Sequence, residues 1–172
     1  IYSAVNGKTE ALMNAGDIKI PGRHNIENYM AAYAAVMDFV KPETLRKTAM
    51  EFGGVAHRIE LVRELRGVQY YNDSIASSPS RTRAGLNSFK DKVILIAGGK
   101  DKSVPFDELG NDIVRHVKKL VVTGFTMEKI RDAVKNSPIY EGEPEIFEVP
   151  DFKQAVLTAA KIAEPGDTVL LS

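Results

Sequence analysis

The middle of the chain contains an uninterrupted apolar run, Val93-Ile94-Leu95-Ile96-Ala97, which is followed directly by Gly98-Gly99-Lys100-Asp101-Lys102. Such a run is typical of a strand that is buried on both faces of a parallel sheet. On either side of it, strand-like and helix-like segments alternate, which predicts further strands at 59–65, 68–71, 120–122, 146–147 and 168–171 and helices at 79–89, 109–117, 127–134 and 152–163. The pattern therefore predicts an α/β fold with a doubly wound, mostly parallel, Rossmann-like sheet that helices cover on both faces.

The part of the chain before the glycine pair Gly53-Gly54 follows a different pattern. Asn6-Gly7 predicts a tight hairpin turn, and Asp17-Ile18-Lys19-Ile20 alternates like a short edge strand. A helix is expected from Asn25, with Asn25 as its N-cap, and a second helix is expected at 42–50. Because the glycine pair offers a hinge, we expect a strand and helix remnant of one domain at 1–52 and a second domain at 53–172.

The composition limits the classes of protein that fit. The chain has 172 residues, 23 basic and 23 acidic side chains and a formal net charge of zero, so we expect neither nucleic acid nor an anionic membrane as a partner. It contains no cysteine, which excludes disulfides and thiolate chemistry. Because no apolar run approaches the roughly 18 residues of a membrane span, we expect a cytoplasmic protein without membrane insertion. We also expect a monomer.

In a doubly wound sheet, ligands bind at the carboxyl ends of the strands. The loops of interest are therefore those after Tyr71, Ala97, Val122 and Leu171. The first loop contains Asn72-Asp73-Ser74 and then Ser77, which lies close to a predicted helix start, where free N–H groups favour an anion such as a carboxylate. The second contains glycines, which let the backbone approach a ligand closely, and lysines, which supply positive charge.

Three motifs follow one another along the chain: Gly22-Arg23-His24-Asn25-Ile26-Glu27-Asn28, Tyr71-Asn72-Asp73-Ser74-Ile75-Ala76-Ser77-Ser78-Pro79 and Gly98-Gly99-Lys100-Asp101-Lys102. In this order and spacing they resemble the Mur ligases, the ATP-dependent enzymes that add amino acids to the peptidoglycan precursor. The second motif is most like that of the members that add D-glutamate. The resemblance extends from about Gly22 to Ser172.

The resemblance implies a reaction and a division of the chain. ATP and magnesium are expected to drive phosphorylation of the carboxylate of UDP-N-acetylmuramoyl-L-alanine, and the amine of D-glutamate would then attack the acyl phosphate. Residues 1–52 would form the end of the family's central ATP-binding domain. Residues 53–172 would form most of its C-terminal amino-acid-binding domain.

Four residues match the family's contacts to ATP. Asn25 and Asn28 correspond to the adenine contacts, and their spacing puts both carboxamides on one side of a helical turn. Arg58 corresponds to the catalytic arginine that reaches the γ-phosphate, a role that suits a guanidinium, and it is expected to act when the hinge closes. Asp73 corresponds to the ribose contact. Without the resemblance, Asn25 fits a helix cap and Asp73 fits an ordinary turn.

Two residues match the family's contacts to D-glutamate. Ser77 stands where the family commonly has threonine, and Lys102 corresponds to the lysine that holds a D-glutamate carboxylate. Lys100 is expected to face solvent. Ile75 departs from the family, which usually has a lysine near the reacting phosphate, so either another cation replaces that lysine or this subgroup works without it.

In the family, the P-loop and the magnesium ligands would lie upstream of Ile1. We therefore predict no metal ligand in this chain and no ligase activity of the chain alone. Gly7-Lys8-Thr9 looks like the end of a P-loop, but the pattern requires glycine where this chain has Tyr2, and a hairpin turn is the better interpretation.

Two alternatives stay open at this point. Another Mur ligase or a folylpolyglutamate synthase would share the fold and the ATP chemistry, but it would carry a D-[DY]-A-H or D-G-A-H-N run after the corresponding strand, and this chain lacks one. A non-enzymatic α/β module would share the alternation of strands and helices without needing Asn25, Arg58, Asp73 and Lys102 in a ligand site.

Overall fold

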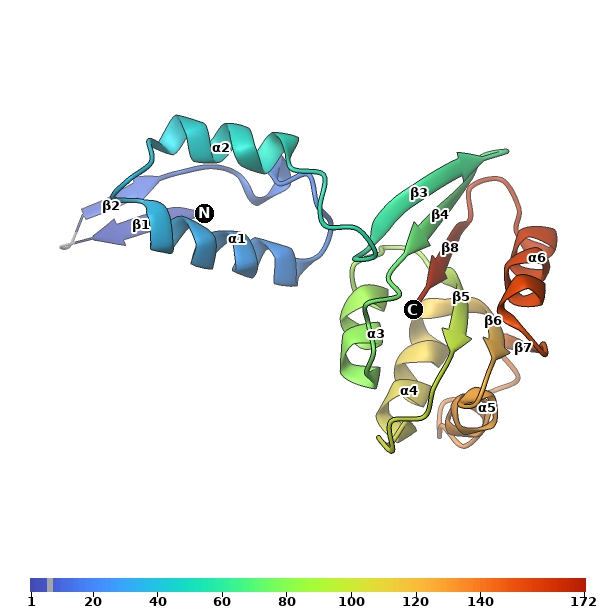
Figure 1. The fold of residues 1–172 in the computed structure, drawn as a ribbon. Coiled ribbons are helices and arrows are strands. Elements are labelled where there is room, and N and C mark those ends of the chain that lie inside the picture. The colour runs from blue at the N-terminus through green and yellow to red at the C-terminus, as the bar shows by residue number, and fades with distance from the viewer. Residues whose placement is uncertain (6–7) are drawn as a thin grey trace. The chain divides into compact units, whose positions relative to one another are not determined.

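The structure, a computed structural model, describes residues 1–5 and 8–172 of the chain (Figure 1). It divides into two compact units, Ile1–Gly54 and Val55–Ser172. Gly54 has a φ of 97°, a left-handed conformation that glycine adopts readily. The assignment of the first unit to the end of an ATP-binding domain stays a prediction.

The first unit combines a two-stranded antiparallel sheet with two helices. Strand β1 (Tyr2–Val5) pairs with β2 (Lys8–Ala11), and the predicted turn at Asn6-Gly7 lies outside the described residues. After the 3-10 turn η1 (Ala15–Asp17) come α1 (Arg23–Val36) and α2 (Pro42–Glu51). Proline occupies the first turn of α2, where its missing N–H costs nothing.

Two predictions for this unit are wrong. The segment Asp17–Ile20 is not a strand, because Asp17 closes η1 by accepting a hydrogen bond from the Asn14 N–H (3.3 Å) and the chain after it packs on α2, with the Lys19 N–H donating to the Ala49 carbonyl (3.0 Å). Asn25 is not an N-cap either. Helix α1 starts at Arg23, after Gly22 with a φ of 100°, so Asn25 lies inside the first turn.

The second unit is built on a six-stranded sheet with the order β3-β4-β8-β5-β6-β7. Strands β3 (Glu60–Leu65) and β4 (Val68–Asn72) form an antiparallel hairpin. The remaining pairs are parallel and add the strands β5 (Val93–Gly98), β6 (Val117–Thr123), β7 (Glu145–Glu148) and β8 (Thr168–Leu171). The predicted α/β fold with a mostly parallel sheet is confirmed.

Four helices connect the parallel strands: α3 (Pro79–Leu86), α4 (Asp107–His116), α5 (Met127–Lys135) and α6 (Phe152–Ile162). Each lies where the sequence predicts a helix, but the ends differ. Helix α3 ends before the predicted Phe89. Val117, predicted to end a helix, begins β6 instead because it pairs with Val93 of β5.

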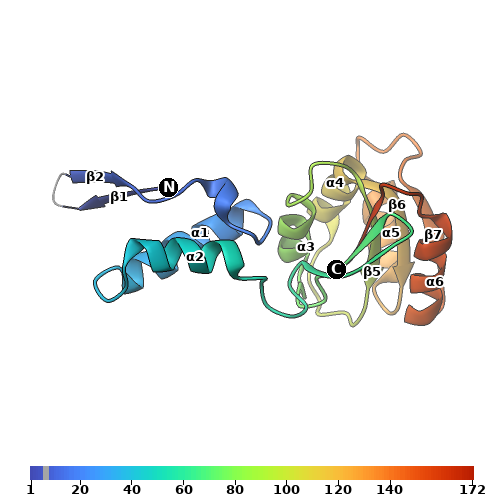
Figure 2. The same ribbon diagram turned by 90° about the horizontal axis from the view of Figure 1, so that it is seen from above.

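Alternating side chains of the central strands build a separate core on each face of the sheet. On one face, Leu95 and Ala97 of β5 pack in a cluster with Ile113 of α4 and Val134 of α5. On the other face, Ile94 and Ile96 pack in a second cluster with two alanines of α6. Figure 2 shows α3 and α4 on one side of the sheet and α6 on the other. This alternation explains why β5 is apolar at every buried position.

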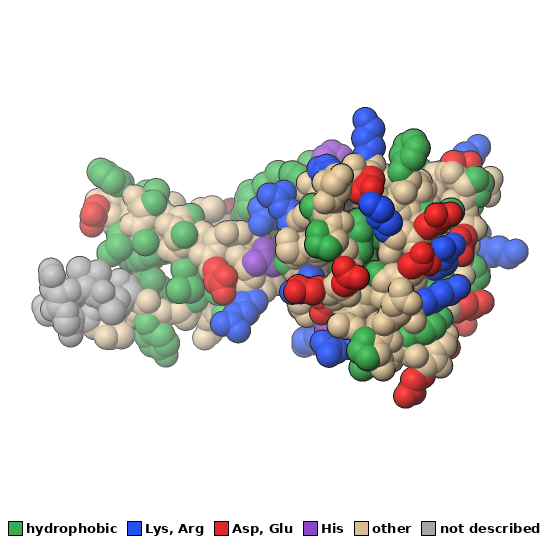
Figure 3. All heavy atoms as spheres, turned by 90° about the horizontal axis from the view of Figure 1, so that it is seen from below, with side chains coloured by type: hydrophobic (Ala, Val, Ile, Leu, Met, Phe, Trp, Pro, Cys, Tyr) green, Lys and Arg blue, Asp and Glu red, His purple; other side chains and the backbone are tan. Residues whose placement is uncertain are grey.

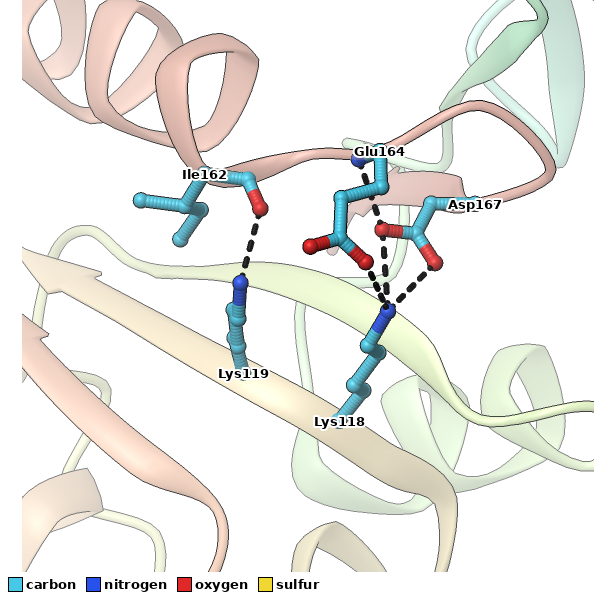
Figure 4. Close-up of polar contacts among 5 residues, drawn as sticks. All are labelled: Lys118, Lys119, Ile162, Glu164 and Asp167. Atoms are coloured by element: carbon cyan, nitrogen blue, oxygen red, sulfur yellow. Dashed lines mark hydrogen bonds and ion pairs between the residues drawn. The ribbon is translucent and has the colours of Figure 1, made fainter.

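At the amino ends of the parallel strands, the turn between α6 and β8 is fastened to β6 (Figure 4). Lys118 Nζ donates to both carboxylate oxygens of Asp167 (2.9 and 3.3 Å) and to Glu164 (3.3 Å). Asp167 also accepts a hydrogen bond from the Glu164 N–H (2.9 Å), and Lys119 Nζ donates to the Ile162 carbonyl (2.8 Å). We call Lys118, Glu164 and Asp167 the amino-end cluster.

Charged side chains of opposite sign also pair on the surface of the second unit. Arg83 of α3 lies 2.7 Å from Glu108 of α4, and Arg131 of α5 lies 3.1 Å from Glu148 of β7. Figure 3 shows acidic and basic side chains next to one another on the face seen from below. Exposed pairs of this kind contribute little to stability, so the two apolar cores hold the fold together.

Candidate functional site

A cleft of about 270 Å³ lies at the carboxyl ends of the parallel strands in the second unit. Its walls come from the loop after β4, the loop after β5, the start of α5 and the end of β8. The polar side chains among its lining residues include Ser77, Ser78, Lys100, Lys102, Thr126 and Ser172. We call this space the carboxyl-end cleft. It lies where ligands bind in open α/β sheets.

The loop after β4 brings Ser77 to the start of α3. The loop is held by its own hydrogen bonds, from the Ser74 N–H to Asn72 Oδ1 (3.0 Å) and from the Ala76 N–H to the Asp73 carbonyl (2.8 Å). Ser77 is exposed and lines the cleft, while Ile75 is half exposed and is not one of its lining residues. In the described part of the chain, the N–H groups of residues 78 and 80 donate no hydrogen bond, so the α3 N-terminus is open to an anion.

The loop after β5 depends on Gly98. Its φ is 151°, and a Cβ at this position would lie 1.8 Å from the carbonyl oxygen of Thr123, its neighbour in β6. Beyond the glycines, Asp101 accepts a hydrogen bond from the Ser103 N–H (2.9 Å) and forms an ion pair with Lys129 of α5. The hydrogen bond from Lys129, assisted by that from Ser103, holds the pKa of the Asp101 carboxyl below its usual range.

This loop presents two lysines to the cleft. Lys100 and Lys102 are both exposed and both line it, so the prediction that Lys100 faces solvent is incomplete. Over residues 1–5 and 8–172, neither lysine forms an ion pair with a carboxylate. Two unpaired cations beside an open helix N-terminus suit an anionic ligand.

Asp73 and Arg58 lie near each other but not among the lining residues of the cleft. Asp73 is 4% exposed; its Oδ1 accepts a hydrogen bond from the Ile59 N–H (3.1 Å), and its Oδ2 lies so close to Gly85 that a Cβ there would be 2.7 Å away. Burial raises the pKa of this carboxyl, and the Ile59 N–H and the charge of Arg58 offset part of that rise. Arg58 itself is exposed.

The remaining predicted site residues, Asn25 and Asn28, belong to the first unit. Asn25 is 6% exposed and its Nδ2 donates to the Pro21 carbonyl (2.6 Å). Asn28 is exposed and donates through Nδ2 to Asn25 Oδ1 (3.5 Å), so the two carboxamides lie side by side on α1. The carboxamide oxygen of Asn28 is left able to accept from a ligand.

No helix in the described part of the chain is long and apolar enough to cross a membrane. Residues 1–5 and 8–172 also contain no group of three or more histidine, aspartate or glutamate side chains that could hold a metal ion.

The loops after Val122 and Leu171 were predicted to border a ligand site, but no side chain in them was predicted to contribute. The structure shows Thr126 and Ser172 among the cleft residues, together with Thr82 of α3, whose Oγ1 accepts a hydrogen bond from Ser172 Oγ (3.0 Å). Thr126 could have been found as the polar residue that precedes a helix after a buried strand. Nothing in the pattern of α3 distinguishes Thr82, which faces the end of a strand far away in the sequence.

The mostly parallel sheet with a cleft at the carboxyl ends of its strands defines the chain as an open α/β domain. Residues 57–172 match the family described as Mur ligase, glutamate ligase domain. This match covers more than half of the chain, and the chain belongs to the Mur ligase family.

Two relatives carry the name UDP-N-acetylmuramoylalanine--D-glutamate ligase. The one from Ruminiclostridium cellulolyticum is 52% identical over 175 residues, which is 100% of this chain and 37% of the relative. The one from Acetivibrio thermocellus is 52% identical over 171 residues, 97% of this chain and 37% of the relative. The chain thus spans little more than a third of the length of these relatives.

Solved structures share the fold at low sequence identity. UDP-N-acetylmuramate-alanine ligase MurC from Thermotoga maritima has a TM-score of 0.67 at 20% identity, over 90% of this chain and 35% of that one. The Mycobacterium tuberculosis folylpolyglutamate synthase complexed with ADP has a TM-score of 0.64 at 14% identity, over 88% of this chain and 37% of that one. These similarities support the fold and say nothing further about this chain.

Proposed function

We propose that this chain is the amino-acid-binding part of an ATP-dependent ligase that joins D-glutamate to UDP-N-acetylmuramoyl-L-alanine. The names of relatives that are about half identical to it support the reaction. The observation that carries the proposal is the carboxyl-end cleft, which Lys102 and Lys100, without a carboxylate partner in the described structure, line together with the open N-terminus of α3.

In the proposed complex, Lys102 and Ser77 hold one carboxylate of D-glutamate. Lys102 supplies a point charge, and Ser77 donates its hydroxyl beside the free N–H groups of α3. Holding the carboxylate orients the amine of D-glutamate toward the activated precursor. The amine then attacks from a fixed position, which lowers the entropic cost of the reaction. ATP, with magnesium, supplies the phosphoryl group that activates the carboxylate of the precursor.

On the nucleotide side, the proposal assigns adenine to Asn25 and Asn28, the γ-phosphate to Arg58 as the catalytic residue, and the ribose to Asp73. The free carboxamide oxygen of Asn28 and the exposed guanidinium of Arg58 fit these roles. Asp73 fits less well, because one of its oxygens is bonded to the Ile59 N–H and the other lies against Gly85. The monomeric state and the cytoplasmic location stay predictions.

The test is the ligase reaction of the full-length protein with Lys102→Ala. Removing the cation leaves a D-glutamate carboxylate unpaired in a partly dry cleft, a loss of roughly 2 to 5 kcal/mol, so the KM for D-glutamate should rise by about one to three orders of magnitude. The KM for ATP should stay nearly constant, and Lys100→Ala should have a smaller effect than Lys102→Ala.

Lys153→Ala is the matched control, because Lys153 is exposed on α6 and is not one of the cleft residues. The proposal fails if Lys102→Ala mainly weakens the use of ATP, or if it behaves like Lys153→Ala. It also fails if the full-length protein ligates a different amino acid and leaves D-glutamate untouched.

A further inference from the structure

Arg58 extends from a segment whose backbone is fixed on both sides of it. His57 and Ile59 have left-handed backbones, with φ values of 65° and 44°, and a β-branched residue such as Ile59 rarely adopts this conformation. The Ile59 N–H is held by Asp73 Oδ1 (3.1 Å), and the His57 N–H donates to Glu60 Oε2 (2.7 Å). The fold therefore fixes the point from which the exposed Arg58 side chain extends, at a cost in backbone strain.

The loop after β4 is bonded to this segment through Ile75. The Ile75 N–H donates to the His57 carbonyl (3.2 Å), and Asn72 Nδ2 lies 2.9 Å from Nδ1 of the His57 ring. The Ile75 carbonyl accepts a hydrogen bond from Nη1 of Arg81 (3.4 Å), which belongs to the first turn of α3. Ile75 thus joins the backbone next to Arg58 to the guanidinium of Arg81, and all of these residues lie in the second unit.

Both arginines keep their charge available for a ligand. Over residues 1–5 and 8–172, neither Arg58 nor Arg81 forms an ion pair with a carboxylate, and both side chains are exposed. Asp73 acts on Arg58 through its charge alone. The side chain of Ile75, which links the two arginines, is half exposed and brings no charge of its own. Two such guanidiniums suit a phosphoryl group, whose oxygens accept paired hydrogen bonds.

A third arginine on the same helix shows the contrast. Arg83, two residues after Arg81, pairs with Glu108 (2.7 Å) and with Asp112, and both of these carboxylates belong to α4. Its charge is therefore used within the protein to hold α3 against α4. The single hydrogen bond of Arg81 to a backbone carbonyl leaves its other N–H groups able to bind an anion.

We propose that Arg81 is a second catalytic arginine, which binds the phosphoryl group together with Arg58 while that group is transferred. The inference rests on the proposed function of the chain as part of a ligase. In that reaction a carboxylate oxygen of the precursor attacks the γ-phosphorus of ATP, and the bond from this phosphorus to the β-phosphate oxygen breaks. ADP leaves with the electron pair, and an acyl phosphate is formed. Negative charge is spread over the phosphoryl oxygens during this step, and a fixed pair of cations stabilises it.

The test is the ligase reaction of the full-length protein with Arg81→Ala. Losing a group that stabilises charge in the transition state should lower kcat about 100-fold, while the KM for D-glutamate stays nearly constant. Arg81→Lys keeps a cation and should lose less activity. Because Ile75 is bonded to Arg81, Ile75→Lys places a new cation beside the missing guanidinium and should raise the kcat of the Arg81→Ala protein about tenfold.

Arg115→Ala is the matched control, because Arg115 is exposed in the last turn of α4 and is not one of the cleft residues. It should keep the kcat of the unsubstituted protein. The inference is wrong if Arg81→Ala behaves like Arg115→Ala, if it mainly raises the KM for D-glutamate, or if Ile75→Lys restores no activity to it.

The same assay separates this inference from the proposed function. If Lys102→Ala raises the KM for D-glutamate while Arg81→Ala leaves kcat unchanged, the role of Arg81 is wrong and the proposed function stands. If the unsubstituted full-length protein does not ligate D-glutamate, the proposed function and the role of Arg81 both fail.

Discussion

The two ends of the six-stranded sheet each contain a largely buried aspartate, Asp73 after β4 and Asp167 before β8. In both carboxyls, burial on its own acts to raise the pKa, but the net shift differs. For Asp73 burial dominates, and the pKa stays above its usual value. For Asp167 the Glu164 N–H and the Lys118 ammonium outweigh burial, and the pKa falls below its usual value.

This difference extends to the surroundings of the two groups. In the amino-end cluster, the carboxylate of Asp167 finds its donors within the protein. In the carboxyl-end cleft, Thr126, Lys102 and the starts of α3 and α5 keep polar groups that no described residue pairs with. Cations and helix N-termini without a partner in the described structure favour an anionic ligand, which agrees with the proposed amino-acid site at this end. The amino end is built for stability.

The largest effect on stability should come from adding a methyl group at Gly98, at the end of β5. Gly98→Ala would place a Cβ 1.8 Å from the Thr123 carbonyl oxygen, on a backbone with a φ of 151°. Since a strand end must move to relieve this contact, we expect a loss of about 3 kcal/mol or more in the free energy of unfolding, measured by denaturant titration. The same movement should also weaken the binding of D-glutamate in the carboxyl-end cleft.

Gly99→Ala is the control for this change. Gly99 has a φ of 128°, but no atom lies within 4 Å of a Cβ placed there. The variant carries the backbone strain without the contact, so it should cost only about 1–2 kcal/mol. Equal losses for the two variants would show that the close approach of β5 to β6 is not what requires glycine.

A smaller effect is expected at the amino end. Asp167→Asn keeps the shape of the side chain but removes its charge, which weakens the hydrogen bonds from Lys118 and Glu164. Since Lys118 is 39% exposed, water screens part of its ion pair, and we expect a loss of about 1–2 kcal/mol at neutral pH. D-glutamate binding should not change, because the residue lies at the far end of the sheet.

The effect of Asp167→Asn on the free energy of unfolding should depend on pH. The folded pKa of Asp167 is lowered, so the unfolded chain binds its proton more readily, and the stabilisation is complete above pH ~4 and is lost as the pH falls through the folded pKa. The loss of stability below pH 4 should therefore be shallower for Asp167→Asn than for the unsubstituted chain. Glu164→Gln, at a side chain that is 70% exposed, should cost less stability at neutral pH than Asp167→Asn. An unaltered limb in Asp167→Asn would contradict the role of the amino-end cluster.

The strands, the helices and the fold class of the second unit could be predicted from the sequence. The runs at β5 and β6 are apolar because both faces of these strands are buried, which leaves a strong local signal. The order of the strands was not predicted, because β8 inserts between β4 and β5 only through pairings with residues distant in sequence. Asp17–Ile20 was misread because a short alternation does not distinguish a strand from an extended segment packed on a helix.

The candidate site could be predicted only in part. The glycines and Lys102 stand out because they belong to a recognisable motif after a buried strand. Thr126 and Thr82 do not, because their position in the cleft depends on which helix starts meet at the sheet edge. Asp73 was predicted as a ligand contact, but local sequence cannot show that its carboxylate turns toward the Ile59 N–H.

The smallest effect on stability should come from Asp73→Asn, and its pH dependence should run opposite to that at the other end. The variant keeps an acceptor for the Ile59 N–H and removes the cost of burying a charge, so we expect a change of less than about 1 kcal/mol at pH 7. Because the folded pKa of Asp73 is raised, the unsubstituted chain loses some stability as the pH rises from ~4 through that pKa, and the Asn variant does not. The free energy of unfolding, measured at pH 4 and at pH 7, should therefore rise with pH for Asp73→Asn relative to the unsubstituted chain.

The control for this prediction is Asp73→Ala, which leaves the Ile59 N–H unpaired and should cost about 1–3 kcal/mol at both pH values. If Asn is as costly as Ala at pH 7, the charge of Asp73 stabilises the fold, and the contrast between the two aspartates is wrong.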